Sequence, residues 1–187
     1  MAKIIAICGL MRSGKDTVAD YICTKKGYTK VHIADALKKT VQVLFGFTQE
    51  QLETDRKDVI DPNWGISPRA AMQFLGTEVM QYKIQELLPH IGRTFWIASL
   101  VSQLKRCPEK TFVISDLRFI HEHDYLKQHF KNVRVIKVMN PNIKHSCLHA
   151  HNSEQEFKKI EENHIIINNS DLTSLYQKIE ALLSQIE

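Results

Sequence analysis

Residues 4–17 read Ile-Ile-Ala-Ile-Cys-Gly-Leu-Met-Arg-Ser-Gly-Lys-Asp-Thr, and this stretch decides the fold. Its first part is apolar without alternation, which is typical of a parallel strand that is buried on both faces. A glycine-containing turn follows, and the Gly-Lys pair then opens a helical pattern over about 15–26. Glycines let successive backbone N–H groups point inward, and a helix start adds a favourable dipole. The stretch therefore predicts a phosphate-binding loop.

This P-loop pattern departs from its usual form at one position. The residue after the lysine is normally Ser or Thr, whose hydroxyl binds magnesium, whereas this chain has Asp16. Three interpretations stay open: Asp16 binds the ion directly or through water, Thr17 takes part, or the acid only favours the helix start. Lys15 is expected to supply a charge for the outer phosphates. The alternative for the whole motif is a purely structural tight turn between strand and helix, in which the lysine binds no ligand.

The composition predicts one globular domain. The chain has 187 residues, 43% of them hydrophobic, and a net charge of +4 that is dispersed along the sequence. The absence of a basic stripe argues against a nucleic-acid partner. We find no apolar run near the roughly 20 residues of a membrane span, and no signal-peptide pattern. Four scattered cysteines without paired spacing complete the expectation of a reduced, cytoplasmic protein without a membrane partner.

Four further apolar strand patterns follow along the chain, and helical patterns separate them. We expect these strands at 28–33, 111–115, 133–138 and 165–167. Helices are expected at 15–26, 34–44, from Ser67 onward, at 94–105, at 121–130 and from Leu172 onward. Such alternation predicts an α/β fold with a doubly wound, five-stranded parallel sheet and helices on both faces. The polar stretch 46–66 is expected to be a loop or a short helical insertion.

Two places outside the loop carry charged residues in patterns that suggest ligands. Asp116 and Arg118 follow the strand at 111–115, where ligands gather in parallel sheets, so we expect Asp116 to be a magnesium-side carboxylate and Arg118 to point into the same crevice. Arg69 and Gln73 lie four residues apart on the helix that begins at Ser67, and they can fork a phosphate and read a base edge. A surface pair without a ligand is the alternative. Met72, Leu75, Val79 and Met80 are expected to form the buried stripe of that helix.

The polar segment 139–157 contains His145, Cys147, His149 and His151. Four potential ligands raise a zinc site as one possibility, but their spacing matches no established zinc pattern. We therefore favour a flap over the phosphates.

Several of these motifs together resemble one family. The segments are 9–17, 69–77, Phe95-Trp96-Ile97, Ser115-Asp116-Leu117-Arg118 with Glu122, 151–154 and 167–170. In this order they resemble phage-type deoxynucleoside monophosphate kinases over nearly the whole chain, with only 46–66 unmatched. The resemblance implies a single P-loop kinase domain over 1–187, in which 46–90 is the helical acceptor-nucleotide region and 140–157 a short lid. Unlike many nucleoside monophosphate kinases, this lid contains no arginine.

The resemblance also implies a reaction and a set of site residues. The γ-phosphoryl group of ATP would pass to a deoxynucleoside monophosphate, with ATP and Mg²⁺ as cofactors. The ATP side would comprise Gly9, Met11, Arg12, Ser13, Gly14, Lys15, Asp16 and Thr17, with Asn168 and Asn169 near the adenine. The acceptor side would comprise Asp35, Lys38, Arg69, Gln73, Thr77, Arg118, Glu122 and His151. Lys15, Arg12, Asp116 and Arg118 would carry catalysis, and Asp16 and Asp116 would hold magnesium, directly or through water.

Rival interpretations remain at this point. Animal-type phosphomevalonate kinase also resembles the chain at Ser-Gly-Lys-Asp and Ser-Asp-x-Arg, while dephospho-CoA kinase resembles it less because Asp16 departs from the usual Ser or Thr. A non-catalytic nucleotide-binding module would need no second charged pair such as Asp116 and Arg118. The small-molecule substrate is the expected partner, and a homodimer is compatible with the sequence.

Overall fold

The computed structural model of the chain describes residues 2–143 and 156–186. The chain forms two compact units: unit 1 comprises Met1–His32 and Val101–Glu187, and unit 2 comprises Ile33–Leu100. Unit 2 is therefore inserted into the sequence of unit 1, and it contains the 46–90 region.

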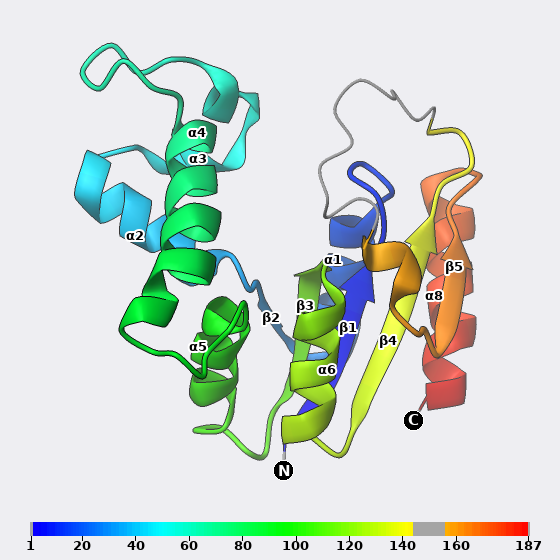
Figure 1. Cartoon of the computed structure of the whole chain (residues 1–187). Coiled ribbons are helices and arrows are strands. Elements are labelled where there is room, and N and C mark those ends of the chain that lie inside the picture. Colours follow the sequence, from blue (N-terminus) through cyan, green and yellow to red (C-terminus); the bar gives the residue numbers. More distant parts are fainter. Residues whose placement is uncertain (1, 144–155, 187) are drawn as a thin grey trace. The chain divides into compact units, whose positions relative to one another are not determined.

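Unit 1 is built on a five-stranded parallel sheet (Figure 1). Its strands are β1 (Lys3–Cys8), β2 (Thr29–Val31), β3 (Thr111–Leu117), β4 (Val133–Met139) and β5 (His164–Ile167), in the order β2-β3-β1-β4-β5. The connecting elements are α1 (Lys15–Lys26), α6 (Ile120–His129), η5 (Phe157–Lys159) and α8 (Leu172–Ile186). Helices α1 and α8 pack together on one face of the sheet, and α6 covers the other (Figure 1). The predicted doubly wound α/β sheet is confirmed.

Strand β1 lies at the centre of this sheet, between β3 and β4. Every residue from Ile4 to Cys8 is buried, which explains why its sequence shows no polar alternation. On one face, Ile5 and Ile7 join an apolar core to which α1 and α8 also contribute. Because all five strands are parallel, their carboxyl ends meet at one edge of the sheet, where the phosphate-binding loop begins.

Strand β3 differs from its prediction at this same edge. It extends two residues further than expected, to Leu117, and its pairing with β1 is irregular. Ala6 pairs with Ile114 and Cys8 with Leu117, so β3 holds one residue more than β1 between these pairs. A bulge of this kind re-aims the side chains beside it, here Ser115 and Asp116.

Unit 2 is helical in its described elements. It contains α2 (Asp35–Phe45), α3 (Gln49–Glu53), η1 (Asp55–Asp58), α4 (Pro68–Gln73), the π-helical η2 (Phe74–Tyr82), η3 (Lys83–Glu86) and the first part of α5 (Phe95–Leu104). Its small core consists of Val41, Phe47, Leu52 and Ala71. Thr48 and Gln51 form a capping box at the start of α3, as expected of a short helical insertion. Ser67 caps α4, with Pro68 in its first turn.

The predicted buried stripe of the α4 region is confirmed only in part, because Met72 and Leu75 pack against the core of unit 2 without being fully buried. Met72, Leu75, Val79 and Met80 are only half-buried, whereas Gly76 and Gln81 are fully buried. From Phe74 onward the winding changes from α-helical to wider π-helical, which rotates the later side chains, Val79 and Met80 among them, away from an α-helical stripe. Indole Nε1 of Trp96 donates a hydrogen bond of 2.9 Å to the carbonyl of Gly76, which fastens this segment to α5.

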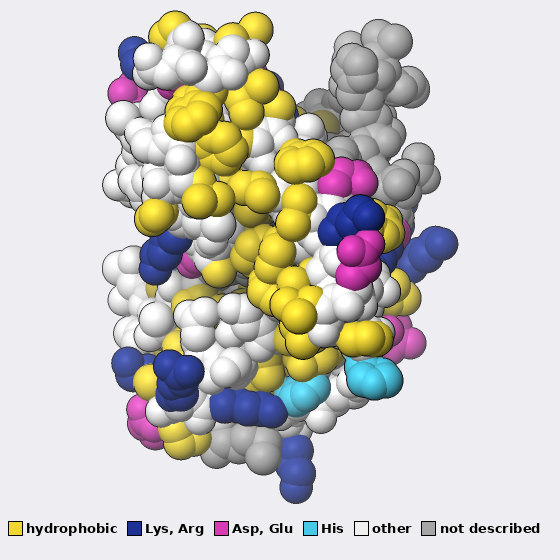
Figure 2. All heavy atoms as spheres, turned by 60° about the vertical axis from the view of Figure 1, so that its left-hand side comes forward, with side chains coloured by type: hydrophobic (Ala, Val, Ile, Leu, Met, Phe, Trp, Pro, Cys, Tyr) yellow, Lys and Arg dark blue, Asp and Glu magenta, His cyan; other side chains and the backbone are white. Residues whose placement is uncertain are grey.

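Exposed large hydrophobic side chains are concentrated in unit 2. Those of unit 2 are Val43, Leu44, Val59, Ile60, Trp64, Ile66, Phe74, Tyr82, Leu87 and Leu88. Figure 2, which turns the left-hand side of Figure 1 forward, shows hydrophobic side chains gathered on the surface. No helix within the described ranges is long and apolar enough to span a membrane.

Candidate active site

The phosphate-binding loop follows β1 and has an unusual backbone. Gly9, Arg12 and Gly14 have φ angles of +148°, +65° and +98°. A Cβ on Gly9 would overlap the carbonyl oxygen of Val138, so this position requires glycine for space as well as for conformation. The Oγ atom of Ser13 is buried and has no hydrogen-bond partner among the described residues. A buried polar atom of this kind, within a loop of constrained backbone, fits a site that is completed by a polar ligand.

Lys15 begins α1 and folds back over the loop. Its Nζ donates a hydrogen bond of 2.7 Å to the carbonyl of Leu10. Burial lowers the pKa of Lys15, the positive charge of Arg118 lowers it further, and the charges of Asp16 and Asp116 oppose the shift. Lys15 therefore lies near enough to Arg118 and Asp116 for their charges to act on it, and the catalytic roles expected of these three residues stay predictions.

Asp16 is held by one side chain from β3, one from β2 and one from the residue after β2. Its Oδ1 accepts a hydrogen bond of 3.0 Å from the buried Ser115 hydroxyl and lies 3.1 Å from Lys30 Nζ and 3.9 Å from His32 Nε2. The pKa of Asp16 is held far below its usual range, first by His32 and then by Lys30. Sequence reasoning assigned no role to Lys30 and His32. Their position in the predicted second strand, near its carboxyl end, was the signal that could have found them.

The donor set here suits a magnesium ion bound with phosphates. Mg²⁺ is usually held by one or two carboxylates together with substrate phosphates and waters. Asp16 is ionised, and its three contacts above all use Oδ1, which leaves Oδ2 outside them. Asp116 adds a second carboxylate whose charge acts on Lys15. Over the ranges that the structure describes, no group of three or more His, Cys, Asp or Glu could hold a metal ion by itself.

Glu122 lies in the first turn of α6 and is buried. Its Oε2 accepts hydrogen bonds of 2.9 Å from the backbone N–H of Arg118 and 3.0 Å from that of Phe119. Burial raises the pKa of Glu122 to about 7, although these two hydrogen bonds lower it. The carboxylate is thus directed at the turn that carries Arg118. Its expected contact with the substrate stays a prediction.

Asn168 and Asn169 follow β5 at the same edge of the sheet. The Asn168 side chain donates a hydrogen bond of 3.0 Å to the carbonyl of Ser13, inside the loop. Asn169 instead accepts a hydrogen bond of 2.8 Å from Lys178 on α8. Their predicted place near an adenine is untested, but Asn168 does lie against the phosphate-binding loop.

In unit 2, the two expected acceptor cations are both in ion pairs. Arg69 on α4 forms a two-point pair with Asp58, in which Nη2 lies 3.1 Å from Oδ2 and Nε contacts Oδ1. Lys38 on α2 lies 2.7 Å from Glu53 Oε2. Sequence reasoning missed both carboxylates, because they lie in the polar insertion, where no pattern marked them.

The other acceptor residues predicted in unit 2 are described by their positions and exposure. Gln73 is exposed at the end of α4, Thr77 is half-buried in η2, and Asp35 lies in the first turn of α2. His151 falls outside the described residues, as do His145, Cys147 and His149 of the zinc alternative.

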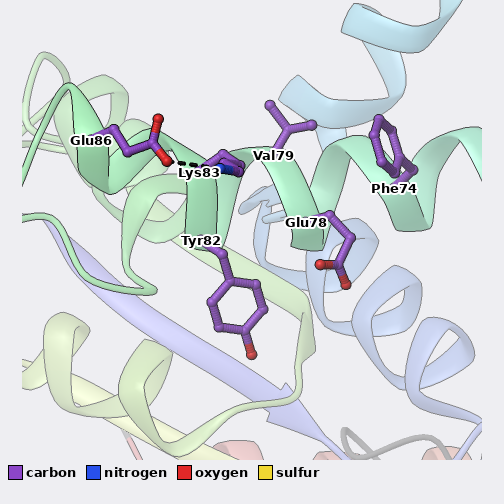
Figure 3. A pocket seen from close by; sticks show the side chains of 6 residues that line it. All are labelled: Phe74, Glu78, Val79, Tyr82, Lys83 and Glu86. Atoms are coloured by element: carbon purple, nitrogen blue, oxygen red, sulfur yellow. Dashed lines mark hydrogen bonds and ion pairs between the residues drawn. The ribbon is translucent and has the colours of Figure 1, made fainter.

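A hollow of about 500 Å³ lies elsewhere on unit 2 (Figure 3). Its lining residues are Phe74, Glu78, Val79, Tyr82, Lys83 and Glu86. All six belong to the continuous η2–η3 segment, where Lys83 pairs with Glu86, so the hollow is a depression over one helical face. None of the predicted acceptor residues lines it.

The strand order, the loop after the central strand and the charged end of β3 define a P-loop kinase fold. Solved structures support this class. Dephospho-CoA kinase from Campylobacter jejuni aligns with a TM-score of 0.55 at 15% identity, covering 100% of this chain and 98% of its own. TT1252 from Thermus thermophilus aligns with a TM-score of 0.52 at 16% identity, covering 100% and 98%.

Sequence comparison specifies the family. The model of the family described as deoxynucleotide monophosphate kinase matches residues 3–61 and 46–179. The chain belongs to this family. It is also 29% identical to a provisionally named deoxynucleotide monophosphate kinase of Acanthamoeba polyphaga mimivirus, over 94% of this chain and 93% of that protein. The expected family and fold are both confirmed.

Proposed function

We propose that this protein transfers the γ-phosphoryl group of ATP to a deoxynucleoside 5′-monophosphate, giving the diphosphate and ADP. The observation that carries the proposal is the phosphate-binding loop, whose Lys15 shares an electrostatic environment with Asp116 and Arg118. A module that only binds nucleotide has no need of a second charged pair at the loop. Membership of the deoxynucleotide monophosphate kinase family supports the choice of acceptor.

The reaction itself needs no nucleophilic side chain. An oxygen of the acceptor phosphate attacks the γ-phosphorus, the bond from that phosphorus to the β–γ bridging oxygen breaks, and ADP leaves with the bridging oxygen. The protein contributes alignment of the two ligands and neutralisation of their charge. We assign this neutralisation to Lys15, Arg12 and Arg118.

Asp16 and Asp116 are the residues that we expect to hold magnesium, directly or through water. The ion supplies positive charge to the donor phosphates when it is bound. The contacts of Asp16 with Ser115, Lys30 and His32 fix its orientation before any ligand arrives. Asp16 would thus replace the usual Ser or Thr hydroxyl with a charged magnesium ligand, and its neighbours hold that carboxylate in place.

For the acceptor, we assign phosphate binding to Arg69 and Lys38, with Gln73 and Thr77 on the same side. Arg69 already presents its guanidinium in the two-point geometry that a phosphate would use. In the free protein Asp58 occupies that geometry, and Glu53 plays the same part for Lys38. An arriving phosphate would compete with these carboxylates.

A side-by-side assay tests the proposal. ADP formation is coupled to a spectroscopic signal in the presence of ATP and Mg²⁺, with each deoxynucleoside monophosphate, each ribonucleoside monophosphate and phosphomevalonate as acceptors. We expect turnover with at least one deoxynucleoside monophosphate and none with phosphomevalonate. Turnover with phosphomevalonate alone, or ATP binding without turnover on any acceptor, would refute the assignment.

A further inference from the structure

The corner after β5 contains a carboxamide that is built into the phosphate-binding loop. We infer that Asn168 is a positioning residue that sets the orientation of the peptide between Ser13 and Gly14, and thereby the affinity for the donor's phosphates. This inference rests on the proposed function only in taking the loop as the phosphate site. It differs from an adenine contact, which was the role that family resemblance implied for this residue.

The Asn168 carboxamide contacts the backbone of the phosphate-binding loop directly. Asn168 Nδ2 donates to Ser13 O over 3.0 Å, across a sequence separation of 155 residues. A carbonyl oxygen only accepts hydrogen bonds, so the amino group of the carboxamide must face it. The peptide bond is trans and planar, and its N–H points opposite to its C=O. Holding Ser13 O on Asn168 therefore turns the Gly14 N–H to the other side of the peptide, away from Asn168.

Gly14 lies so close to Asn168 that it has no room for a side chain. A Cβ on Gly14 would lie 2.5 Å from Asn168 Nδ2, and the φ of Gly14 is +98°. Glycine at this position therefore gives the loop its conformation and also makes room for the carboxamide. Replacing Gly14 would remove both features, so the two residues form one unit of the loop.

Asn168 and its neighbours are held in place by hydrogen bonds to β4 and α8. Its backbone N–H donates a 2.7 Å hydrogen bond to the carbonyl of Met139 at the end of β4. The flanking residues are tied to α8, because Lys178 Nζ donates to Ile167 O over 2.7 Å and to Asn169 Oδ1 over 2.8 Å. The carboxamide thus extends from a corner that two neighbouring elements fix, and it transmits that rigidity to the loop.

The consequence concerns phosphate binding. If the Ser13–Gly14 peptide were free to rotate, its carbonyl could face the bound phosphates, where like partial charges repel, and its N–H would be lost as a donor. Asn168 disfavours that state before the ligand arrives. A preorganised donor needs no ordering at the moment of binding, so the gain appears in affinity for any ligand that carries the phosphates.

The test separates phosphate positioning from adenine recognition. We would measure the dissociation constants of ATP and of inorganic tripolyphosphate by calorimetry for the full chain and for Asn168→Ala. We expect both ligands to weaken by a similar factor of about five, the worth of one hydrogen bond, while acceptor KM stays unchanged. Asn168→Asp, which keeps the shape but lacks the donor and adds a negative charge, should weaken both ligands by more than about fivefold.

A matched control lies at the other end of the same strands. Asn163 Oδ1 accepts a 2.8 Å hydrogen bond from the Val135 N–H, so Asn163→Ala removes a comparable carboxamide–backbone bond far along β4 and β5 from the loop. We expect this variant to lose some thermal stability and to bind tripolyphosphate as the wild type does. Equal weakening in Asn163→Ala and Asn168→Ala would show a general stability effect and overturn the inference.

Two other results would also overturn it. Weakened ATP binding with unchanged tripolyphosphate binding in Asn168→Ala would assign the residue to the adenine, and unchanged binding of both ligands would leave it without a role in the loop. Should the Asn168 variants unfold, exchange of the Asn168 carboxamide protons in the unliganded wild type decides, because a proton that is held on Ser13 O is protected and that of a free side chain is not. A wild type that binds neither ligand would refute the phosphate-binding loop itself, and this inference with it.

Discussion

The proposed donor residues in unit 1 and the proposed acceptor residues in unit 2 are anchored in different ways. The loop of unit 1 emerges from a strand that is buried on both sides, and Asn168 holds it from a neighbouring corner. In unit 2, Arg69 and Lys38 are held by ion pairs with carboxylates of the polar insertion, and the Arg69 side chain is 39% exposed. Among the described residues, unit 2 also carries most of the exposed large hydrophobic side chains.

We infer from this difference that the two sets of residues have different roles. A loop of backbone groups that follows a buried strand is fixed by the fold, so it suits the binding of the donor phosphates that we propose for it. A site made of long side chains in exposed ion pairs is adjustable, because such pairs contribute little to stability and exchange partners readily. We therefore expect substitutions in unit 1 to affect turnover or folding, and substitutions in unit 2 to affect acceptor affinity.

The largest effect is expected from Lys15→Ala. Removing the charge over the loop should lower kcat by about a thousandfold, because a charged donor is lost in a partly buried site. Circular dichroism should show an intact fold. The control is Lys25→Ala, at the other end of the same helix in a surface pair with Glu180, which should keep normal turnover. Normal turnover in Lys15→Ala would remove the loop from the mechanism.

Glu122→Gln should change the pH dependence of stability. The pKa of Glu122 is raised from about 4.5 to about 7 by burial, so the folded state binds its proton more tightly than the unfolded state does. Its contribution is fully present below the unfolded pKa and is lost as pH rises toward 7. Over this interval, the free energy of unfolding of the wild type should fall by about 3 kcal/mol relative to Glu122→Gln.

Urea unfolding at a series of pH values measures this difference. Gln retains an oxygen that can accept the Arg118 and Phe119 amides, so the variant should fold. Replacement of the exposed Glu109 by Gln serves as the control and should follow the wild-type curve. Parallel curves for Glu122→Gln and wild type would show that the buried carboxyl does not titrate in this range.

Arg69→Ala tests the adjustable side of the comparison. Loss of the guanidinium should raise the acceptor KM by about tenfold, as expected for a charged hydrogen-bonding partner, while the ATP KM changes less than about twofold. Steady-state kinetics with each substrate varied in turn gives both constants. Arg56→Ala, which removes another arginine of unit 2 from an ion pair with Glu50, should change neither. Equal increases in both KM values would take Arg69 out of the acceptor site.

The smallest effect is expected from Asp58→Asn. Asparagine releases the charge of Arg69, so the acceptor phosphate meets less competition and its KM should fall about twofold to threefold at low salt. At high salt the difference from wild type should vanish, because the exposed pair is screened. A higher acceptor KM in this variant would mean that Asp58 orients Arg69 instead of competing for it.

Sequence reasoning predicted the sheet and the loop because their signals are local. Buried strands such as β1 show as unbroken apolar runs, and a Gly-Lys pair before a helix marks the loop directly. The π-helical segment escaped it, since nothing in a periodicity of 3.6 residues announces wider winding at Phe74. Division into two units was also not anticipated, because the chain enters and leaves unit 2 without a linker-like composition.

The site shows the same contrast between local and distant signals. Lys15 was predicted from the Gly-Lys pair of the loop, and Asp116 and Arg118 from their place after the strand at 111–115; in the structure the charges of Asp116 and Arg118 act on Lys15. Contacts of Asp16 with Lys30 and His32, and of Asn168 with Ser13, depend on register and bulges that the sequence does not reveal. Partners such as Asp58 and Glu53 lie in an insertion whose composition is that of any polar surface.

The most direct test of the proposed reaction is to follow the transferred group. Wild-type protein is incubated with ATP labelled at the γ-phosphorus, Mg²⁺ and one deoxynucleoside monophosphate at a time, and the products are separated by chromatography. The account predicts that the label appears on a deoxynucleoside diphosphate, in step with unlabelled ADP. Label that stays in ATP with every deoxynucleoside monophosphate, or appears only as inorganic phosphate, would contradict it.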